Sequence, residues 1–262
     1  MELNDAIKPL AALAHPGRLA LFRMLLRLAP QGGRPREMAL AMGLPHNTLS
    51  HHLADLEAAG LISHARVGRG RLYRVEPARV AELFDYLSLD CARGRAGLAP
   101  AAPPARAPPG VYFLCSGNSA RSILAEALMA ARAPGMAAYS AGTRPARAVH
   151  PLALAELAAR GLAAPGHRPQ GLTALAKAPP PDLVLTLCDQ AAFEECPQWP
   201  GAPLAAHWGL PDPVRAASPE AFSQAFSTLN ARITALSTLP PDLDRAGLQA
   251  ALDRIGLDQM EC

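Results

Sequence analysis

The spacing of apolar residues along the 262-residue chain changes character near residue 100. Upstream, leucines recur at intervals of three and four, as in Leu49, Leu53 and Leu56, which is the period of amphipathic helices. We therefore predict helices over residues 6–28, broken near Pro16, and over 36–42, 45–60 and 79–89. In the first of these, we expect Leu19, Phe22 and Leu25 or Leu26 to lie on one face. Residues 61–65 and 71–75 are predicted as two strands joined by a turn.

Downstream, short runs of unmixed apolar residues alternate with helical stretches. The predicted strands cover residues 111–114, 136–140 and 182–187, and the predicted helices cover 122–133, 151–160, 219–239 and 242–257. Continuous apolar runs are typical of parallel strands that are covered on both faces. The alternation of strand and helix therefore predicts an α/β domain with a parallel sheet.

A segment rich in proline and alanine, residues 93–109, separates the two patterns. It has no apolar period, so we predict a semi-extended linker. The sequence thus predicts two domains. These are a mainly α domain over residues 1–92 and an α/β domain over 110–240, followed by a helical tail at 241–262.

Composition narrows the class of protein. Hydrophobic residues make up 50% of the chain, which is typical of globular proteins, and the net charge of +3 permits contact with nucleic acid. The acidic residues Glu2 and Asp5 argue against a secretory signal, and charged residues interrupt the early apolar region. We therefore predict a cytoplasmic protein without membrane contact. In the reducing cytoplasm, cysteines are more often catalytic or metal-binding than disulfide-bonded, and we expect the same of the five cysteines here.

The order of elements in the first half indicates a winged helix-turn-helix. Two short helices meet at Gly43, and a basic hairpin follows the second of them. A solvated polar helix beside a charged hairpin has the same composition, but this order of elements favours a DNA-binding domain. The candidate DNA contacts are His46, Asn47, Thr48, Ser50, His51 and His52 on the second helix, and Arg66, Arg69 and Arg71 in the wing.

The chemistry of the second half begins at residues 115–122, which read Cys-Ser-Gly-Asn-Ser-Ala-Arg-Ser between a strand and a helix. The amides of such a loop can close around a tetrahedral oxyanion. We expect the helix terminus and Arg121 to lower the pKa of the Cys115 thiol, and the Ser122 hydroxyl to donate to its sulfur. The predicted oxyanion-binding residues are Ser116, Gly117, Asn118, Ser119, Ala120, Arg121 and Ser122.

Residues 46–62 read His-Asn-Thr-Leu-Ser-His-His-Leu-Ala-Asp-Leu-Glu-Ala-Ala-Gly-Leu-Ile, which closely resembles the recognition helix of the arsenic-responsive ArsR repressors. The resemblance covers residues 5–92 and implies a homodimer, held by the first and last helices of the domain, on two-fold operator DNA. Members of that family sense arsenite through cysteines. This chain has only Cys91 near one family position, although trivalent arsenic prefers three thiolates, so Cys91 is a candidate arsenite ligand.

The second half resembles the low-molecular-weight protein tyrosine phosphatases and, among them, the thioredoxin-coupled arsenate reductases. Besides residues 115–122, the matching motifs are Tyr-Ser-Ala-Gly-Thr at 139–143, Leu-Thr-Leu-Cys-Asp at 185–189, Glu-Cys-Pro at 195–197 and His-Trp-Gly-Leu-Pro-Asp-Pro at 207–213. The resemblance implies that Cys115 is the nucleophile, that Arg121 clamps the oxyanion, and that Asp212 is the general acid.

Two further cysteines distinguish the reactions within this resemblance. In the reductase pattern, Cys188 attacks the adduct of Cys115 with arsenic and expels arsenite, and Cys196 then captures Cys188 in a disulfide. The implied external reductant is thioredoxin, and no bound cofactor is implied. Ala120 stands where some reductases have an additional cysteine outside the relay.

The sequence predicts a bifunctional arsenic-resistance protein, in which a DNA-binding repressor is joined to an arsenate reductase. Two alternatives stay open. One is a tyrosine phosphatase joined to a winged-helix regulator, for which Cys188 and Cys196 are inert. The other is a transcription factor whose second half senses an oxyanion without turnover.

Overall fold

The computed structural model describes residues 1–68, 70–93, 110–162, 167–194 and 199–257. The chain divides into two compact units, Met1–Ala102 and Pro103–Cys262. Cys196, Cys262 and Arg69 lie outside the described residues.

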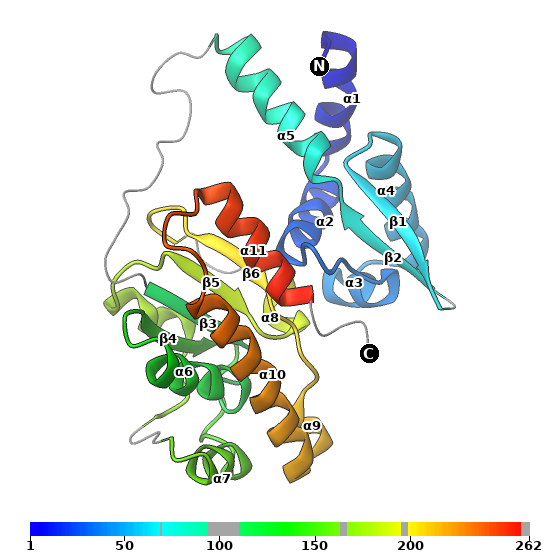
Figure 1. Ribbon diagram of the computed structural model, residues 1–262. Helices are drawn as coiled ribbons and strands as arrows, with labels where there is room; N and C mark the ends of the chain where they lie inside the picture. Colours follow the sequence, from blue (N-terminus) through cyan, green and yellow to red (C-terminus); the bar gives the residue numbers. More distant parts are fainter. Residues whose placement is uncertain (69, 94–109, 163–166, 195–198, 258–262) are drawn as a thin grey trace. The chain divides into compact units, whose positions relative to one another are not determined.

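The first unit is mainly helical. Its elements are α1 (Leu3–Leu13), α2 (Pro16–Arg27), α3 (Pro35–Met42), α4 (His46–Ala58), β1 (Ile62–Val67), β2 (Gly70–Val75) and α5 (Pro77–Asp85), which continues into a π-helical turn at Tyr86–Cys91 (Figure 1). Prolines open α2, α3 and α5, because the first helical position needs no N–H donor. Gly43 ends α3 in the left-handed conformation, which lets the chain turn into α4.

The core of the first unit lies between α2 and α4. Phe22 and Leu25 of α2 are buried, as are Leu49, Leu53 and Leu56 of α4, in agreement with the helical spacing of the sequence. Leu19 corrects the prediction for α2, because it is 42% exposed while Leu21 is fully buried. The buried face of α2 therefore contains the expected Phe22 and Leu25 together with Leu21, but not Leu19.

The second unit is a parallel α/β domain, as predicted. Its elements are β3 (Gly110–Cys115), α6 (Arg121–Arg132), β4 (Ala137–Gly142), α7 (Pro151–Ala159), a 3₁₀ segment (Leu172–Lys177), β5 (Leu183–Thr186), α8 (Asp189–Phe193), β6 (Leu204–His207), α9 (Pro213–Ala216), α10 (Pro219–Ser237) and α11 (Arg245–Leu257). The strands are ordered β4-β3-β5-β6, and all neighbours are parallel. Strand β6 was absent from the sequence prediction.

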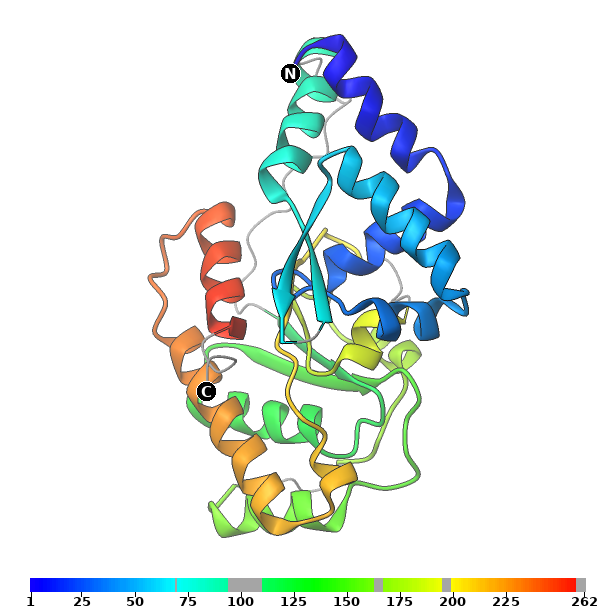
Figure 2. The ribbon, with the colours of Figure 1, turned by 90° about the vertical axis from the view of Figure 1, so that its right-hand side faces the viewer.

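Both faces of this sheet are covered. Alternate residues of β3 point to opposite sides, so Val111 and Phe113 join the core under α6 and α10, while Tyr112 and Leu114 pack with Leu175 on the other face. Figure 2 shows α10 and α11 beside the sheet. The continuous apolar runs of β3 and β5 are therefore explained by burial on two sides.

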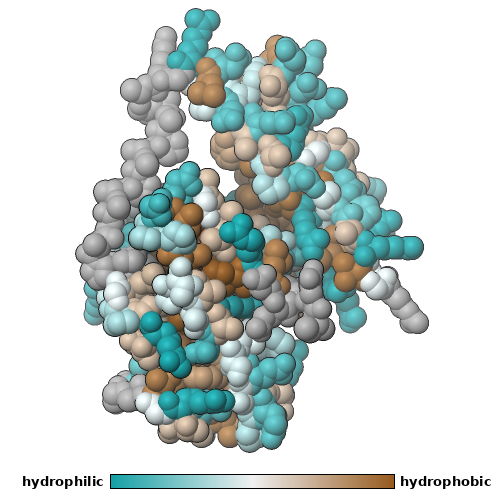
Figure 3. Space-filling model, in the orientation of Figure 1, coloured by the Kyte–Doolittle hydropathy of each residue, from teal (hydrophilic) through white to brown (hydrophobic). Residues whose placement is uncertain are grey.

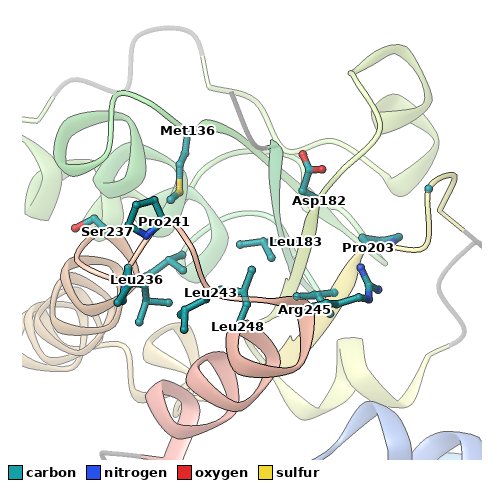
Figure 4. Close-up of a pocket in the computed structure, with 14 residues that line it drawn as sticks. Met136, Asp182, Leu183, Pro203, Leu236, Ser237, Pro241, Leu243, Arg245 and Leu248 are labelled. Carbon is teal, nitrogen blue, oxygen red and sulfur yellow. The ribbon is translucent and has the colours of Figure 1, made fainter. Parts of the chain in front are cut away.

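The two edges of the sheet differ in what they hold. The residues that follow the carboxyl ends of β3 and β5 include the Cys115 loop and Cys188. At the amino ends, a cavity of about 490 Å³ is lined by Leu183, Leu204, Leu236 and Leu248, among others (Figure 4). This cavity therefore lies at the end of the sheet opposite the predicted chemistry.

Of the helices that the structure describes, none combines the length and the apolar character that crossing a bilayer requires.

Candidate active site

The backbone of the Cys115 loop is turned so that its amides face inward. Four of its carbonyl oxygens accept hydrogen bonds from backbone N–H groups of residues 143–150. These bonds join Cys115 to Thr143, Ser116 to Arg144, Gly117 to Ala146 and Ser119 to His150, at 2.8 to 3.1 Å. In a trans peptide the N–H points opposite to the C=O, so the following amides point into the loop. This is the arrangement of amides that the predicted oxyanion site requires.

Asn118 locks this conformation. Its backbone is left-handed, with φ of 47°, and its N–H donates to the Cys115 sulfur at 3.2 Å. Its side-chain nitrogen donates to the hydroxyls of Ser122 and Ser140, and its side-chain oxygen accepts from the backbone N–H of Gln170. Asn118 is fully buried, so these bonds satisfy the whole side chain and hold the loop rigidly.

The polar network continues away from the loop. The Ser140 hydroxyl donates to one oxygen of Glu126 at 2.5 Å, and the other oxygen of Glu126 lies 3.4 Å from the Nε2 atom of His167. Sequence reasoning did not find Ser140, Glu126 or Gln170. The motif at residues 139–143 contains Ser140, whereas Glu126 and Gln170 lie in none of the motifs.

Cys115 is almost completely buried, with 3% of its surface exposed. Burial raises the pKa of its thiol, and the neighbouring Cys188 raises it as well. The hydrogen bonds of Ser122 and the charge of Arg121 lower the pKa, as predicted. The sequence prediction of a net lowering is wrong in sign, because burial disfavours the thiolate more strongly than these contacts favour it.

The Ser122 hydroxyl is aimed at this sulfur. Its oxygen lies 3.0 Å from Cys115 Sγ and accepts from Asn118, which leaves the hydroxyl hydrogen free to donate to sulfur. Ser122→Ala should therefore raise the pKa of the Cys115 thiol further, shift its reaction with iodoacetamide to higher pH, and slow alkylation at pH 7 roughly tenfold or more. Ser116→Ala is the matched control, since Ser116 contacts Cys188 instead. Equal profiles for the two variants would contradict this role of Ser122.

Arg121 and Asp212 are brought together by the fold. One guanidinium nitrogen lies 3.2 Å from the Asp212 carboxylate, and another donates to the Leu210 carbonyl at 3.1 Å. The Arg121 side chain is 9% exposed and that of Asp212 is 41% exposed. Asp212 also accepts the N–H of Val214 at the start of α9. A buried cation and a partly exposed carboxylate thus meet beside the Cys115 loop.

Cys188 lies against the same loop. Its sulfur is 3.4 Å from the Ser116 hydroxyl, and only 5% of the residue is exposed. The structure therefore groups Cys115, Arg121, Asp212 and Cys188. Cys196 lies outside the described residues. Glu194, the last described residue before it, pairs with Arg144 at 2.6 Å.

A buried histidine, His207, supports the end of β5. Sequence reasoning did not assign this histidine to the site. His207 is 2% exposed, contacts the Thr186 hydroxyl at 2.8 Å, and lies 3.1 Å from the Asp189 carboxylate. The hydrogen bond from His207 holds the pKa of Asp189 below its usual value. Because Asp189 directly follows Cys188, this contact anchors the backbone that presents the second thiol.

The predicted DNA contacts lie on α4 and the hairpin. His46, Asn47, Ser50 and His51 are exposed, whereas Thr48 and His52 are half-buried. The His52 ring packs against His15, with centroids 4.9 Å apart. Arg66 and Arg71 are exposed and directly opposite each other in the hairpin. Like charges in that position repel, so an anionic partner would stabilise them.

Cys91 ends the π-helical turn after α5 and is an exposed, free thiol. Among the described residues, no three His, Cys, Asp or Glu side chains form a metal-binding group.

Comparison with solved structures gives partial likenesses. An arsenate reductase from Archaeoglobus fulgidus is 28% identical, with a TM-score of 0.42 over 49% of this chain and 99% of its own. A thioredoxin-dependent arsenate reductase from Corynebacterium glutamicum is 23% identical, with a TM-score of 0.39 over 76% and 90%. A low molecular weight protein tyrosine phosphatase from T. tengcongensis is 22% identical, with a TM-score of 0.42 over 48% and 95%. At these scores the likenesses do not discriminate between reductase and phosphatase.

Family comparison is more informative. No curated protein matches the chain significantly. Residues 13–65 match a helix-turn-helix domain family, which agrees with α3 and α4 as a DNA-binding pair. Residues 110–249, more than half of the chain, match the low molecular weight phosphotyrosine protein phosphatase family, and this span contains the whole Cys115 loop. The chain therefore belongs to the low molecular weight phosphotyrosine protein phosphatase family, with a helix-turn-helix domain joined to its amino-terminal side.

Proposed function

We propose that the protein is a bifunctional arsenic-resistance protein, in which a DNA-binding repressor is joined to a thioredoxin-coupled arsenate reductase. The observation that carries the enzymatic half is the second thiol at the site. Cys188 is buried beside the oxyanion loop, and its sulfur lies 3.4 Å from Ser116, the residue that follows Cys115. A hydrolytic phosphatase needs one thiol, whereas the reduction of arsenate needs two electrons from a pair of thiols.

The proposed relay uses each group in turn. The Cys115 thiolate attacks arsenic, Arg121 and the loop amides hold the oxygens, and Asp212 protonates the oxygen that leaves as water. The Cys188 thiolate then attacks Cys115 Sγ, and the electron pair of the sulfur–arsenic bond reduces As(V) to As(III). Arsenite leaves, and a Cys115–Cys188 disulfide remains.

Cys196 completes the cycle in this proposal. Its thiolate attacks Cys188 Sγ, which releases the Cys115 thiolate and forms a Cys188–Cys196 disulfide that thioredoxin reduces. The ion pair between Glu194 and Arg144 supports this step, because Arg144 also donates its N–H to the loop at Ser116. The chain that leads to Cys196 therefore starts beside the loop.

A recycling assay tests the reductase. The full chain is given arsenate, thioredoxin, thioredoxin reductase and NADPH, and NADPH oxidation and arsenite are measured together. We expect many arsenite molecules per chain, with one NADPH consumed for each. Phosphate in place of arsenate is the control and should consume no NADPH. Hydrolysis of an aryl phosphate without arsenate-dependent NADPH oxidation would identify a phosphatase instead.

Exposed apolar residues support the proposed homodimer of the regulatory half. Leu3 and Ile7 of α1 are 62% and 51% exposed, and Phe84 and Leu89, in and after α5, are 65% and 66% exposed. Figure 3 shows apolar residues at the surface of these helices. Surfaces of this kind mark sites of association, and a second copy of the same domain would cover them.

Phe84→Glu should therefore convert the full chain from dimer to monomer in light scattering, because it places a charge in the apolar contact. The same variant should lose the ability to select inverted repeats from a randomised DNA pool, with affinity lowered at least about a hundredfold. Leu154→Glu, at a 42% exposed leucine of α7, is the control and should remain a dimer. A dimeric Phe84→Glu variant would contradict this interface.

A further inference from the structure

The segment that carries Asp212 is held by a second buried arginine. Arg232 of α10 is 3% exposed, and its guanidinium donates to the carbonyls of Trp208 at 2.7 Å and Gly209 at 3.4 Å. It also donates to the carbonyl of Gly256 in α11 at 3.0 Å. Burying a cation is costly unless it is hydrogen-bonded, so the fold uses this side chain as a connector between three segments.

Helix α11 supplies the outer end of this connection. Gly256 lies in its last turn, where carbonyls have no partner within the helix and the helix dipole attracts a cation. Trp208 is fully buried, and its indole N–H donates to the Leu252 carbonyl at 3.0 Å. Leu252 and Gly256 both lie beyond residue 249, where the match to the phosphatase family ends.

Arg121, at the end of the Cys115 loop, binds the same segment, residues 208–212. It binds the Leu210 carbonyl and the Asp212 carboxylate, while Arg232 binds the carbonyls of Trp208 and Gly209. Residues 208–212 are thus held between two buried guanidinium groups. Pro211 and Pro213 flank Asp212 and restrict its backbone, so a shift at Trp208 is transmitted along the segment.

We propose that Arg232 and the last turns of α11 are positioning elements that set the place of the Asp212 carboxyl in the active site. Arg232 acts through the backbone of Trp208 and Gly209 and touches no reacting atom. The inference rests on the proposed role of Asp212 as general acid. A general acid must lie within hydrogen-bond reach of the leaving oxygen, so a small displacement weakens proton transfer without removing the nucleophile.

Leaving-group dependence tests this proposal in the full chain. Phenolate needs a proton to leave, whereas 4-nitrophenolate needs it much less, so the ratio of kcat for phenyl phosphate to kcat for 4-nitrophenyl phosphate reports on the acid. Arg232→Met should lower this ratio about tenfold, as part of the 10²- to 10⁴-fold contribution of a general acid. Arg232→Lys, which still donates, should recover most of it. Arg254→Met removes an exposed arginine of α11 and should leave the ratio unchanged.

Hydrogen exchange gives a readout that does not depend on turnover. In Arg232→Met, peptides covering residues 207–216 should exchange faster, while those covering 115–122 remain protected. An equal loss of kcat on both substrates, or unchanged exchange at 207–216, would overturn the proposal even if the variant were less stable.

If Asp212→Asn leaves the ratio unchanged, or the wild type hydrolyses neither ester, the assigned chemistry fails. The exchange result then decides separately whether Arg232 holds the segment. Should Arg232→Met not fold, Arg232→Lys is expected to show an intermediate ratio and intermediate exchange.

Discussion

Cys188→Ser should abolish thioredoxin-linked arsenate turnover, lowering it at least about a thousandfold, while hydrolysis of 4-nitrophenyl phosphate continues near the wild-type rate. Serine has nearly the shape of cysteine and preserves the contact with the Ser116 hydroxyl. It cannot form a disulfide with Cys115, so the arsenic adduct has no intramolecular route to arsenite. Hydrolysis uses only the loop, Arg121 and Asp212, which the substitution leaves in place.

Two controls make this result interpretable. Cys91→Ser removes an exposed thiol outside the second unit and should leave both reactions unchanged. Cys115→Ser should abolish both reactions, because each begins with attack by that thiolate. If Cys188→Ser reduces arsenate as fast as the wild type, Cys188 is not the second thiol and the proposed relay is wrong.

Gly142→Ala should lower arsenate turnover and aryl phosphate hydrolysis together, by about a hundredfold or more, because it displaces the oxyanion loop. A Cβ atom at Gly142 would lie 2.5 Å from the Ser116 carbonyl oxygen and 2.9 Å from the Asn118 nitrogen. Both are backbone atoms of the loop, so no side-chain rotation relieves the clash. Steady-state kinetics on both substrates measure the effect.

Gly171→Ala is the matched control for Gly142→Ala. The two glycines pair across an isolated bridge, but the nearest atom to a Cβ at Gly171 is a Pro145 side-chain carbon at 3.8 Å. Its activity should therefore stay close to that of the wild type. If Gly142→Ala is fully active, the loop tolerates displacement. That result would contradict the claim that catalysis requires its backbone amides to be fixed.

The sequence predicted the elements whose signals are local. Leu49, Leu53 and Leu56 recur at helical spacing and are all buried in α4. The unmixed apolar run of β3 predicted a strand buried on two faces, and the residues after it predicted a loop that opens a helix. These patterns are readable because each depends on residues within one or two turns of helix or one strand.

Other features depend on neighbours that are distant in the chain. Leu204–His207 contains two alanines, which have low strand propensity, and forms β6 only because β5 pairs with it. Leu19 has the spacing of a core residue, but it is 42% exposed, because none of the described segments covers it. The net pKa shift of Cys115 was also mispredicted, because the degree of burial depends on how the whole sheet edge packs.

By itself, the sequence determined the two kinds of domain and the position of the loop at residues 115–122, since both follow from local spacing and residue type. Only the tertiary structure decided which distant groups meet there. It placed Cys188 beside Ser116, Asp212 beside Arg121 and Gly142 against the loop backbone. It also showed that Arg232 joins α11 to the segment of Asp212. The physical reason is that a parallel sheet brings the ends of separate strands to one edge, whereas spacing along the chain says little about which side chains meet across it.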